Sequence, residues 1–311
     1  MTTHQCITKT LIVGLSGPSS SGKTTVARLL RSIFNIPASA ETNHHSVTLF
    51  ILHQDDFYKT DAEIPIVTTP LTQRQLQDWD SAAALDLGLL ERSLRFVATH
   101  GQLPPWGLAS KEPEEDGNAG GAGGAGGASG SVSDADIERY RRQVVATVLN
   151  PTPLPASSSS FPPAGKSPRQ AAALGGGGVE MRICVLDGFL LYADPGAQNN
   201  PSIPASITEL LDLKLFLRST EARTRARREA RSGYVTLEGF WRDPDGYVDE
   251  VVWPNYVREH AWIFEGGDVD QGAVRAEVRE RCGIEVAPGM GERAVRVVGY
   301  GWAVGRRVAG A

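Results

Sequence analysis

A short motif near the amino terminus most restricts what this chain can fold into. Residues 17–24 read Gly-Pro-Ser-Ser-Ser-Gly-Lys-Thr and match the phosphate-binding loop pattern G-x-x-x-x-G-K-[ST]. An apolar run at residues 11–15 precedes the loop, and residues 24–34 follow it with apolar side chains at helical spacing. A buried strand before the loop and a helix after it are the context in which this pattern binds nucleotides. The sequence therefore predicts a nucleotide-binding protein built from strands and helices.

The residue types of the loop predict how it holds its ligand. Its two glycines let successive backbone N–H groups point inward, and the following helix adds the positive end of its dipole. Lys23 is expected to neutralise the outer phosphates, and the Thr24 hydroxyl to bind the magnesium ion that accompanies them. We therefore expect ATP and Mg2+ as cofactors. The residues predicted to hold the nucleotide in the loop are Gly17, Pro18, Ser19, Ser20, Ser21, Gly22, Lys23, Thr24 and Thr25.

Two further apolar runs are followed by carboxylates. Residues 47–52 lead to Asp55 and Asp56, and residues 181–186 lead to Asp187. The carboxyl ends of parallel strands form the edge at which open α/β sheets bind ligands. One of the first two aspartates is thus a candidate catalytic base and the third a candidate magnesium ligand, although aspartates also form ordinary turns. The order of elements predicts an α/β fold of the P-loop NTPase type, a three-layer α/β/α sandwich with a mainly parallel sheet.

A tryptophan beside an aspartate precedes the next expected helix. Trp79 offers a flat π face and Asp80 a hydrogen-bond acceptor, a pair suited to stacking on a ring and binding sugar hydroxyls. An aromatic residue at a helix entry is more often part of the core, so both interpretations stay open. The helix is expected to begin at Ser81, as its N-cap, and to end near residue 99.

Five arginines gather within residues 221–234, after a predicted strand at residues 214–217. A charged run of this kind is often a solvated helix face. In a protein that binds ATP, however, arginines at this place are suited to closing over the transferring phosphate. We therefore predict that this segment forms a phosphate-binding lid.

Composition restricts the partners and the compartment. The chain has 31 basic and 36 acidic residues, a net charge of −5, and no lysine-rich block, so nucleic acid is not an expected partner. The three cysteines lack the spacing of metal or redox sites, as is typical of reduced cysteines in the cytosol. No apolar stretch has the form of a signal region or of a membrane span. We expect a cytoplasmic enzyme, with nuclear access and oligomeric state left open, that acts on a small molecule without a membrane partner.

The middle of the chain differs in character from its ends. Residues 104–180 contain acidic, Gly/Ala-rich and Ser-rich runs of low complexity, which predict a largely disordered insertion. Only residues 134–149 carry apolar side chains at near-helical spacing, so a docked helix is expected there. Residues 1–103 and 181–284 are expected to form a single nucleotide-binding domain, and residues 285–311 a C-terminal tail.

The combined motifs resemble those of the nicotinamide riboside kinases, within the uridine kinase-like group of P-loop kinases. The likeness covers residues 11–103 and 181 to about 270, in the family's order. The segments that carry it are the loop from Gly14, Gln54-Asp55-Asp56-Phe57-Tyr58-Lys59, Trp79-Asp80, Asp187-Gly188-Phe189-Leu190-Leu191, the arginines up to Tyr234, Gly246-Tyr247-x-Asp249 and Trp253-Pro254-x-Tyr256. The resemblance implies a P-loop kinase domain that transfers phosphate from ATP to the ribose 5′-hydroxyl of nicotinamide riboside, and of nicotinic acid riboside, to give the mononucleotide for NAD biosynthesis.

The resemblance also implies roles for single residues at the reacting phosphate. Asp55 would accept the proton, and Lys23 and Arg228 would complete the catalytic group. The implied metal ligands are Thr24, Asp55 and Asp187, and the implied lid residues on the ATP phosphates and the substrate are Arg227, Arg228 and Arg231.

On the nucleoside, the resemblance implies that Trp79 stacks on the pyridinium ring and that Asp80 binds the ribose hydroxyls. Tyr234 would supply a second ring over the nicotinamide. The implied substrate-binding residues are Asp55, Asp56, Phe57, Tyr58, Trp79, Asp80, Arg228 and Tyr234.

The chain departs from the family pattern at three places. Trp79 stands where the family usually has tyrosine, which keeps a π face for a cationic ring. Asp187 stands where glutamate is usual, so its carboxylate is one methylene shorter and would reach the metal or the substrate through water. One residue is inserted between Arg231 and Tyr234.

Two other functions fit the same motifs. A uridine or cytidine kinase would share the phosphate loop and the arginine lid. A non-catalytic nucleotide-binding regulatory protein would share the loop and use the insertion to bind a partner. The presence of Lys23, Thr24 and Asp55 argues against the second, because a protein that only binds nucleotide needs no base.

Overall fold

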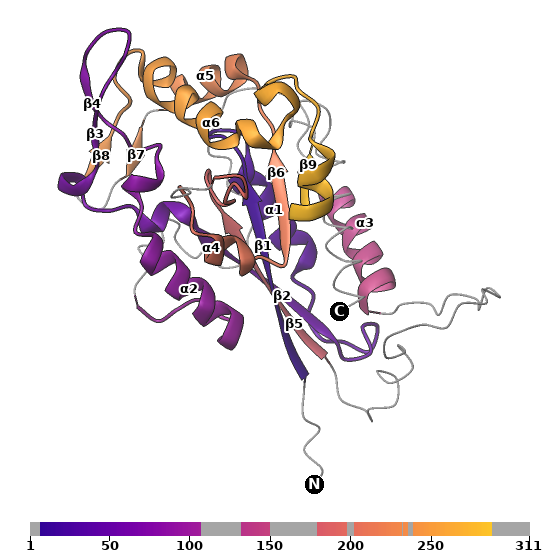
Figure 1. Ribbon diagram of the computed structural model, residues 1–311. Helices are drawn as coiled ribbons and strands as arrows, with labels where there is room; N and C mark the ends of the chain where they lie inside the picture. Colours follow the sequence, from indigo (N-terminus) through magenta and orange to yellow (C-terminus); the bar gives the residue numbers. More distant parts are fainter. Residues whose placement is uncertain are drawn as a thin grey trace.

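A parallel sheet forms the centre of the molecule. The computed structural model describes residues 7–106, 132–149, 179–197, 202–231, 233–235 and 239–287, and Figure 1 shows them in colour. The strands of this sheet are β1 (Ile7–Ser16), β2 (Ser46–His53), β5 (Val179–Asp187), β6 (Leu213–Leu217) and β9 (Ile284–Ala287). They are parallel and lie in the order β2-β5-β1-β6-β9. The predicted α/β fold with its parallel sheet is confirmed.

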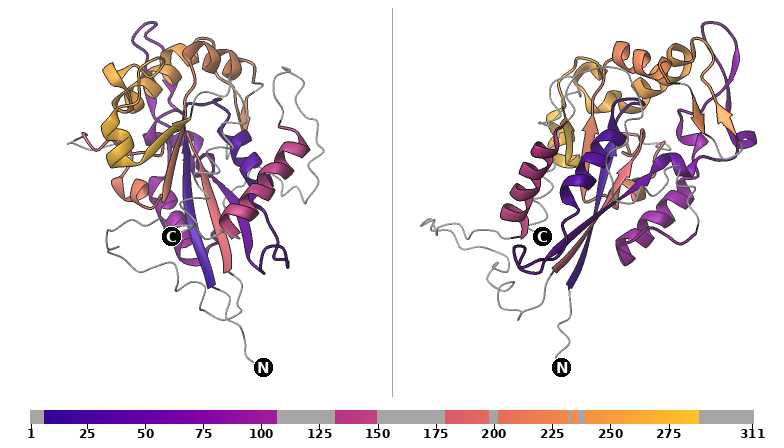
Figure 2. Two further views of the ribbon diagram at one scale, coloured as in Figure 1. Left: turned by 90° about the vertical axis from the view of Figure 1, so that its right-hand side faces the viewer. Right: turned by 180° about the vertical axis from the view of Figure 1, so that it is seen from behind.

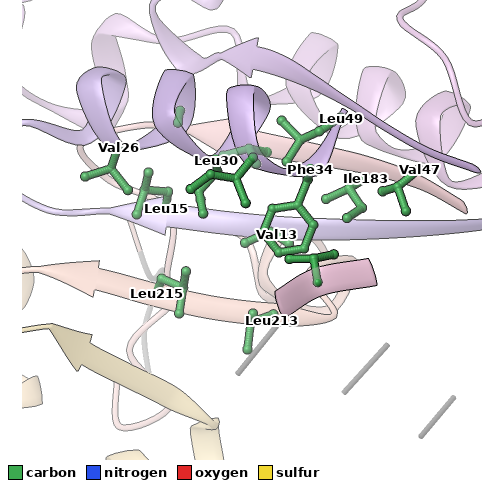
Figure 3. Close-up of a cluster of buried hydrophobic side chains, with 14 of the residues drawn as sticks. Val13, Leu15, Val26, Leu30, Phe34, Val47, Leu49, Ile183, Leu213 and Leu215 are labelled. Atoms are coloured by element: carbon green, nitrogen blue, oxygen red, sulfur yellow. The ribbon is translucent and has the colours of Figure 1, made fainter. Parts of the chain in front are cut away.

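Helices cover both faces of the sheet, because alternate residues of each strand point to opposite sides. Val13 and Leu15 of β1 pack with α1 and α3 (Figure 3), whereas Ile12 packs with α2, α4 and α6. Figure 2 shows the helices on the two sides of the sheet. These helices are α1 (Lys23–Phe34), α2 (Leu87–His100), α3 (Asp134–Val144), α4 (Ala205–Glu209) and α6 (Trp253–His260). The arrangement is the three-layer sandwich that the sequence predicts.

The helix expected within the insertion is present and docks on α1. Tyr140 and Val144 of α3 are buried in the same hydrophobic cluster as α1, and Arg141 Nη2 donates a hydrogen bond to the Ser32 carbonyl at 2.5 Å. The helix continues into a π-helical turn at Val145–Leu149. The low-complexity runs at residues 107–131 and 150–178, for which we expect disorder, lie outside the described residues.

The start of α2 differs from the sequence prediction. Ser81 does not cap the helix: Ala82–Ala84 form a separate 3-10 turn, and α2 begins at Leu87 with Asp86 as its N-cap. Asp86 Oδ1 accepts a hydrogen bond from Leu89 N at 2.8 Å. The interruption arises because Leu85 forms an isolated β-bridge with Tyr58, which holds it in extended conformation.

Short elements gather at the carboxyl ends of the strands (Figure 1). The arginine segment forms α5 (Glu221–Glu229), and two ribbons pair β3 (Ile66–Thr68) with β4 (Gln75–Gln77) and β7 (Tyr234–Val235) with β8 (Phe240–Trp241). The remaining turns are the 3-10 segments Gln54–Phe57, Asp61–Glu63, Ala261–Ile263 and Glu265–Gly267 and the π-helical segments Val248–Val252 and Val278–Cys282.

The boundary expected before the C-terminal tail falls inside a strand. The tail was expected from residue 285, but β9 runs from Ile284 to Ala287 and pairs with β6, so the sheet extends past that point. Residues 288–311 lie outside the described part of the chain. Among the helices that the structure describes, none combines the length and the apolar character needed to cross a membrane.

Candidate active site

The phosphate loop joins β1 to α1 in a conformation that two glycines make possible. Gly17 has φ +147°, and a Cβ on it would lie 2.2 Å from the carbonyl oxygen of Leu217 on the neighbouring strand β6. Gly22 has φ +99° and directly precedes α1. Only glycine adopts such angles at low cost. Lys23 follows and its Nζ donates to the Pro18 carbonyl across the loop at 2.9 Å.

The carboxylates expected at the strand ends lie beside this loop. Asp187 is the last residue of β5, and its Oδ2 accepts a hydrogen bond from Thr24 Oγ1 at 2.6 Å. The same oxygen lies 3.3 Å from His53 Nδ1 at the end of β2. Burial raises the pKa of the Asp187 carboxyl, but its hydrogen bond from His53 and the charge of Lys23 outweigh burial and lower the pKa. Asp55 follows β2, is exposed and lines the same cavity.

The charges of these carboxylates also act on the loop lysine. Burial lowers the pKa of Lys23, and the charges of Asp187 and Asp55 offset part of that effect. Within the described ranges, no three His, Cys, Asp or Glu side chains gather into a metal-binding group. Magnesium at phosphoryl-transfer sites is commonly held by one or two carboxylates together with the phosphates. The hydroxyl of Thr24 and the nearby carboxylates of Asp55 and Asp187 fit that donor set.

Arg228 of α5 is the centre of a buried ionic group. Its guanidinium pairs with both oxygens of Asp80, at 2.6 and 2.8 Å, and its Nε lies 2.6 Å from Asp243 Oδ2. Only 5% of the arginine side chain is exposed. Burial lowers the pKa of Arg228, but the charges of Asp80 and Asp243 raise it well above its usual value, so the guanidinium stays protonated. Asp80, which the sequence predicts to bind the ribose hydroxyls, thus holds Arg228 with both of its carboxylate oxygens.

The other two lid arginines lie at the mouth of the cavity. Arg227 Nη1 donates to the Ser20 carbonyl of the phosphate loop at 3.2 Å, which brings α5 against the loop. Arg231 lies over the ring of Tyr234, with 5.1 Å between its Cζ and the ring centroid, and Arg228 lies 5.0 Å from the same ring. The predicted lid segment thus borders both the loop and an aromatic residue.

Aromatic rings form the wall opposite the phosphate loop. Trp79 lies 5.5 Å from Tyr58 in an edge-on arrangement and 5.6 Å from Trp241 at 42°, between ring centroids. Trp79 is only 5% exposed and packs with Ile64 in a small hydrophobic cluster. Its backbone N–H donates to the Tyr247 hydroxyl at 3.0 Å. Trp79 is therefore packed into a core, as one interpretation predicts, and it also lines the cavity; its stacking on a ligand ring stays a prediction.

Gln54 fixes the loops that carry the carboxylates. It is fully buried, its Nε2 donates to the Leu190 carbonyl at 2.6 Å, and its Oε1 accepts from Leu190 N at 3.1 Å. A Cβ on Gly188 would lie 2.6 Å from that Oε1. The turns after β2 and β5 are thereby tied together, so Asp55 and Asp187 are held on adjacent, mutually anchored segments.

One cavity of about 360 Å3 joins the phosphate loop to the aromatic wall. The predicted site residues that line it are Ser19, Ser20, Gly22, Lys23, Thr24, Thr25, Asp55, Tyr58, Trp79, Asp80, Asp187, Arg227, Arg228, Arg231 and Tyr234. The predicted residues that do not line it are Gly17, Pro18, Ser21, Asp56 and Phe57. Gly17 and Pro18 stabilise the loop conformation instead, through the close approach of Gly17 to Leu217 and the hydrogen bond that the Pro18 carbonyl accepts from Lys23.

The prediction that Phe57 binds substrate is wrong. Its side chain is 1% exposed and packs in the hydrophobic cluster beneath α2, because the 3-10 turn Gln54–Phe57 points it away from Asp55. Residues that line the cavity without a predicted role are His53, Gly188, Phe189 and Trp241. His53 and Phe189 each lie two residues from a predicted strand-end carboxylate, Asp55 or Asp187, and this spacing could have identified them as site residues. Trp241 has no such neighbour in sequence.

Comparison with known proteins agrees with this site. Residues 12–103 match the phosphoribulokinase/uridine kinase family model. A nicotinamide riboside kinase of Schizosaccharomyces pombe is 31% identical over 84% of this chain and 84% of its own length. Nicotinamide riboside kinases of Eremothecium gossypii and Saccharomyces cerevisiae are each 28% identical, over 87% and 84% of this chain and 84% and 82% of their own lengths.

The parallel sheet and the first of these matches define the class of the chain, a P-loop kinase of the uridine kinase type. Within that class, the similarity to the nicotinamide riboside kinases extends over most of both sequences. The chain belongs to the nicotinamide riboside kinase family, as its motifs predict.

Proposed function

We propose that this chain is an ATP- and Mg2+-dependent kinase that phosphorylates the ribose 5′-hydroxyl of nicotinamide riboside, and of nicotinic acid riboside, to give the mononucleotide for NAD biosynthesis. The observation that carries the proposal is a single cavity that joins a phosphate loop and Asp55 to an aromatic wall. The names of the three relatives support the choice of nucleoside. We further propose that the enzyme works in the cytoplasm as one kinase domain, with small molecules as its substrates.

The loop and the lid arginines bind the ATP phosphates in this proposal. Backbone N–H groups of the loop and the Lys23 ammonium neutralise the outer phosphates, together with Arg227 of α5 and Arg231 just after it. Thr24, Asp187 and Asp55 would hold the magnesium ion, which supplies charge neutralisation at the transferring phosphate. The lowered pKa of the Asp187 carboxyl keeps it ionised for that task.

Asp55 acts on the nucleoside. The carboxylate accepts the proton of the 5′-hydroxyl while that oxygen forms a bond to the γ-phosphorus and the bond from the γ-phosphorus to the β–γ bridging oxygen breaks, which releases ADP. Its exposure and its position in the cavity suit a group that must contact substrate. Lys23 and Arg228 stabilise charge on the transferring group, and the aromatic wall holds the base through Trp79 and Tyr234.

A direct assay tests the proposal. Purified full-length protein is incubated with ATP, with and without Mg2+, and with nicotinamide riboside, nicotinic acid riboside, uridine or cytidine, and ADP is measured against a control without nucleoside. We expect Mg2+-dependent turnover with the two pyridine ribosides. Turnover with uridine or cytidine alone would keep the kinase chemistry and overturn the substrate. No turnover with any nucleoside, in protein that binds ATP, would favour a regulatory protein without catalysis.

A further inference from the structure

Trp241 lies on the ribbon that follows the arginine helix, directly opposite Tyr234. The register of β7 and β8 pairs Tyr234 with Trp241 and Val235 with Phe240. Partners in an antiparallel pair carry their side chains on the same face. Both rings line the cavity, so the ribbon presents two aromatic side chains to it side by side. Phe240, the neighbour on the strand, is 61% exposed on the other face.

The ring of Trp241 extends the aromatic wall toward the open part of the cavity. It lies 5.6 Å from Trp79 and 5.8 Å from Tyr247, between ring centroids, and packs on both. Trp79 is 5% exposed because neighbouring rings and Ile64 cover it, whereas Trp241 is only half-buried. Of the two tryptophans, Trp241 therefore keeps more accessible surface for a planar ligand.

The Nε1 of the same indole is hydrogen-bonded to the buried ionic group of Arg228, Asp80 and Asp243. Trp241 Nε1 donates to Asp243 Oδ1 at 3.0 Å, and the two oxygens of Asp243 also pair with Arg228. With Asp80, this group combines two carboxylates and one guanidinium, and Arg231 lies over the ring of Tyr234 on the paired strand. The face of an indole ring attracts a cationic aromatic ligand more strongly than a neutral one, because the π face is negative.

From this arrangement we infer that Trp241 is a nucleoside-binding residue that determines specificity, with its indole face stacked on the cationic pyridinium ring. The inference rests on the proposed function and goes beyond it, because it assigns stacking on the base to Trp241, which is more exposed than Trp79. Asp243 fixes the orientation of the indole through the Nε1 hydrogen bond. The ribbon thereby couples recognition of the base to the arginine helix that borders the phosphate loop.

Two substitutions separate stacking from the hydrogen bond. Trp241→Leu removes the ring, and Trp241→Phe keeps a π face while losing the N–H. We expect Trp241→Leu to raise the KM and the Kd for nicotinamide riboside roughly tenfold, and Trp241→Phe to raise them by about twofold. The KM for ATP should stay unchanged in both, which also shows that the variants are folded. Titration calorimetry without ATP gives the Kd independently of catalysis.

Trp106→Leu is the matched control, since Trp106 is 41% exposed beside α2 and does not line the cavity. Equal losses in the Leu and Phe variants would overturn stacking, because the effect would then come from the contact with Asp243. A Trp241→Leu enzyme with the KM of the Trp106→Leu control would overturn the inference while the proposed function stands. If the unaltered protein turns over uridine and not nicotinamide riboside, the proposed function itself fails, and the assay distinguishes the two results.

Discussion

The phosphate end and the nucleoside end of the cavity are built in different ways. The phosphate end, where the ATP phosphates would bind, is built around one continuous segment, residues 17–24, which joins the central strand β1 to helix α1. The nucleoside end takes its rings from Tyr58, Trp79, Tyr234 and Trp241, which belong to short segments outside the central sheet. Backbone conformation defines the first end, and side chains from distant segments define the second.

From this difference we expect the two ends to tolerate substitution differently. In the proposed complex the loop binds the ATP phosphates largely through main-chain N–H groups, so we expect its glycines to be the loop positions least tolerant of substitution. At the nucleoside end the cavity is lined by side chains that other side chains hold in place, as Asp80 and Asp243 hold Arg228. Substitutions there should alter binding stepwise instead of abolishing the site.

The largest effect is expected at Asp55, where the two ends meet. Asp55→Asn removes the proton acceptor and keeps the size of the side chain, so kcat should fall by roughly 10²–10⁴-fold. The Kd for ATP, measured by titration calorimetry, should change little. Asp56→Asn is the matched control, because Asp56 does not line the cavity. A larger loss of kcat in Asp56→Asn than in Asp55→Asn would show that Asp56, and not Asp55, is the catalytic base.

The next effect concerns the backbone of the phosphate end. Gly17→Ala forces a Cβ to within 2.2 Å of the Leu217 carbonyl at φ +147°, so the loop must move away from β6. We expect the free energy of unfolding to fall by roughly 3 kcal/mol and the affinity for ATP to fall at least about tenfold. Urea unfolding and calorimetry measure the two quantities.

Gly88→Ala is the control for the same chemical change. Gly88 lies in α2, and a Cβ on it would meet only Asp86 Oδ1 at 3.4 Å, so the variant should keep or gain stability. If both variants unfold at the same urea concentration, the strained glycine is not what shapes the loop.

The sequence predicted the phosphate end nearly completely and the nucleoside end in part. The loop, the helix after it and the strand-end carboxylates are local patterns, so their geometry follows from contiguous residues. Phe57 was misassigned because its direction depends on a 3-10 turn that periodicity does not reveal. Trp241 was missed because its place in the cavity depends on the pairing of β8 with β7, and short ribbons leave no alternation pattern to detect.

The start of α2 and the last strand of the sheet were predicted less well, because both depend on contacts between segments that are distant in sequence. Ser81 looked like an N-cap, but the bridge between Leu85 and Tyr58 delays the start of α2 until after Asp86. The last strand, β9, contains only Ile284–Ala287 and gave no clear signal in sequence. In each case a tertiary contact overrides the local preference.

A smaller effect is expected from the ionic group of the nucleoside end. Asp80→Asn removes one of the two carboxylates that hold Arg228 but leaves a hydrogen-bonding side chain of the same size. The free energy of unfolding should fall by about 2 kcal/mol, because the buried guanidinium keeps only Asp243 as a charged partner. The KM for nicotinamide riboside should rise, while the KM for ATP should change less. Glu138→Gln, which breaks an exposed pair with Arg141, should leave urea unfolding unchanged.

The smallest expected effect is a pH dependence at the junction of the two ends. His260 of α6 is buried near Pro18 and Asp80, its Nδ1 is hydrogen-bonded to the Tyr256 carbonyl, and its Nε2 has no partner among the described residues. Burial lowers the pKa of His260 to about 4; the hydrogen bond to the Tyr256 carbonyl and the charge of Glu259 raise it by less, and the charge of Lys23 lowers it further. The unfolded chain, with an ordinary histidine pKa, therefore binds this proton first as the pH falls.

The sign of the effect follows from that order. Stability is complete above the ordinary histidine pKa and is lost as the pH falls from there toward about 4. Between pH 7.5 and 5.5 the residue should cost about 1 kcal/mol in the free energy of unfolding. His260→Gln should reduce the difference between the two pH values by that amount, measured by urea unfolding, whatever its effect at either pH alone. His100→Gln, at an exposed position, controls for the loss of a histidine. An equal reduction in that variant would show that His260 is not the source of the pH dependence.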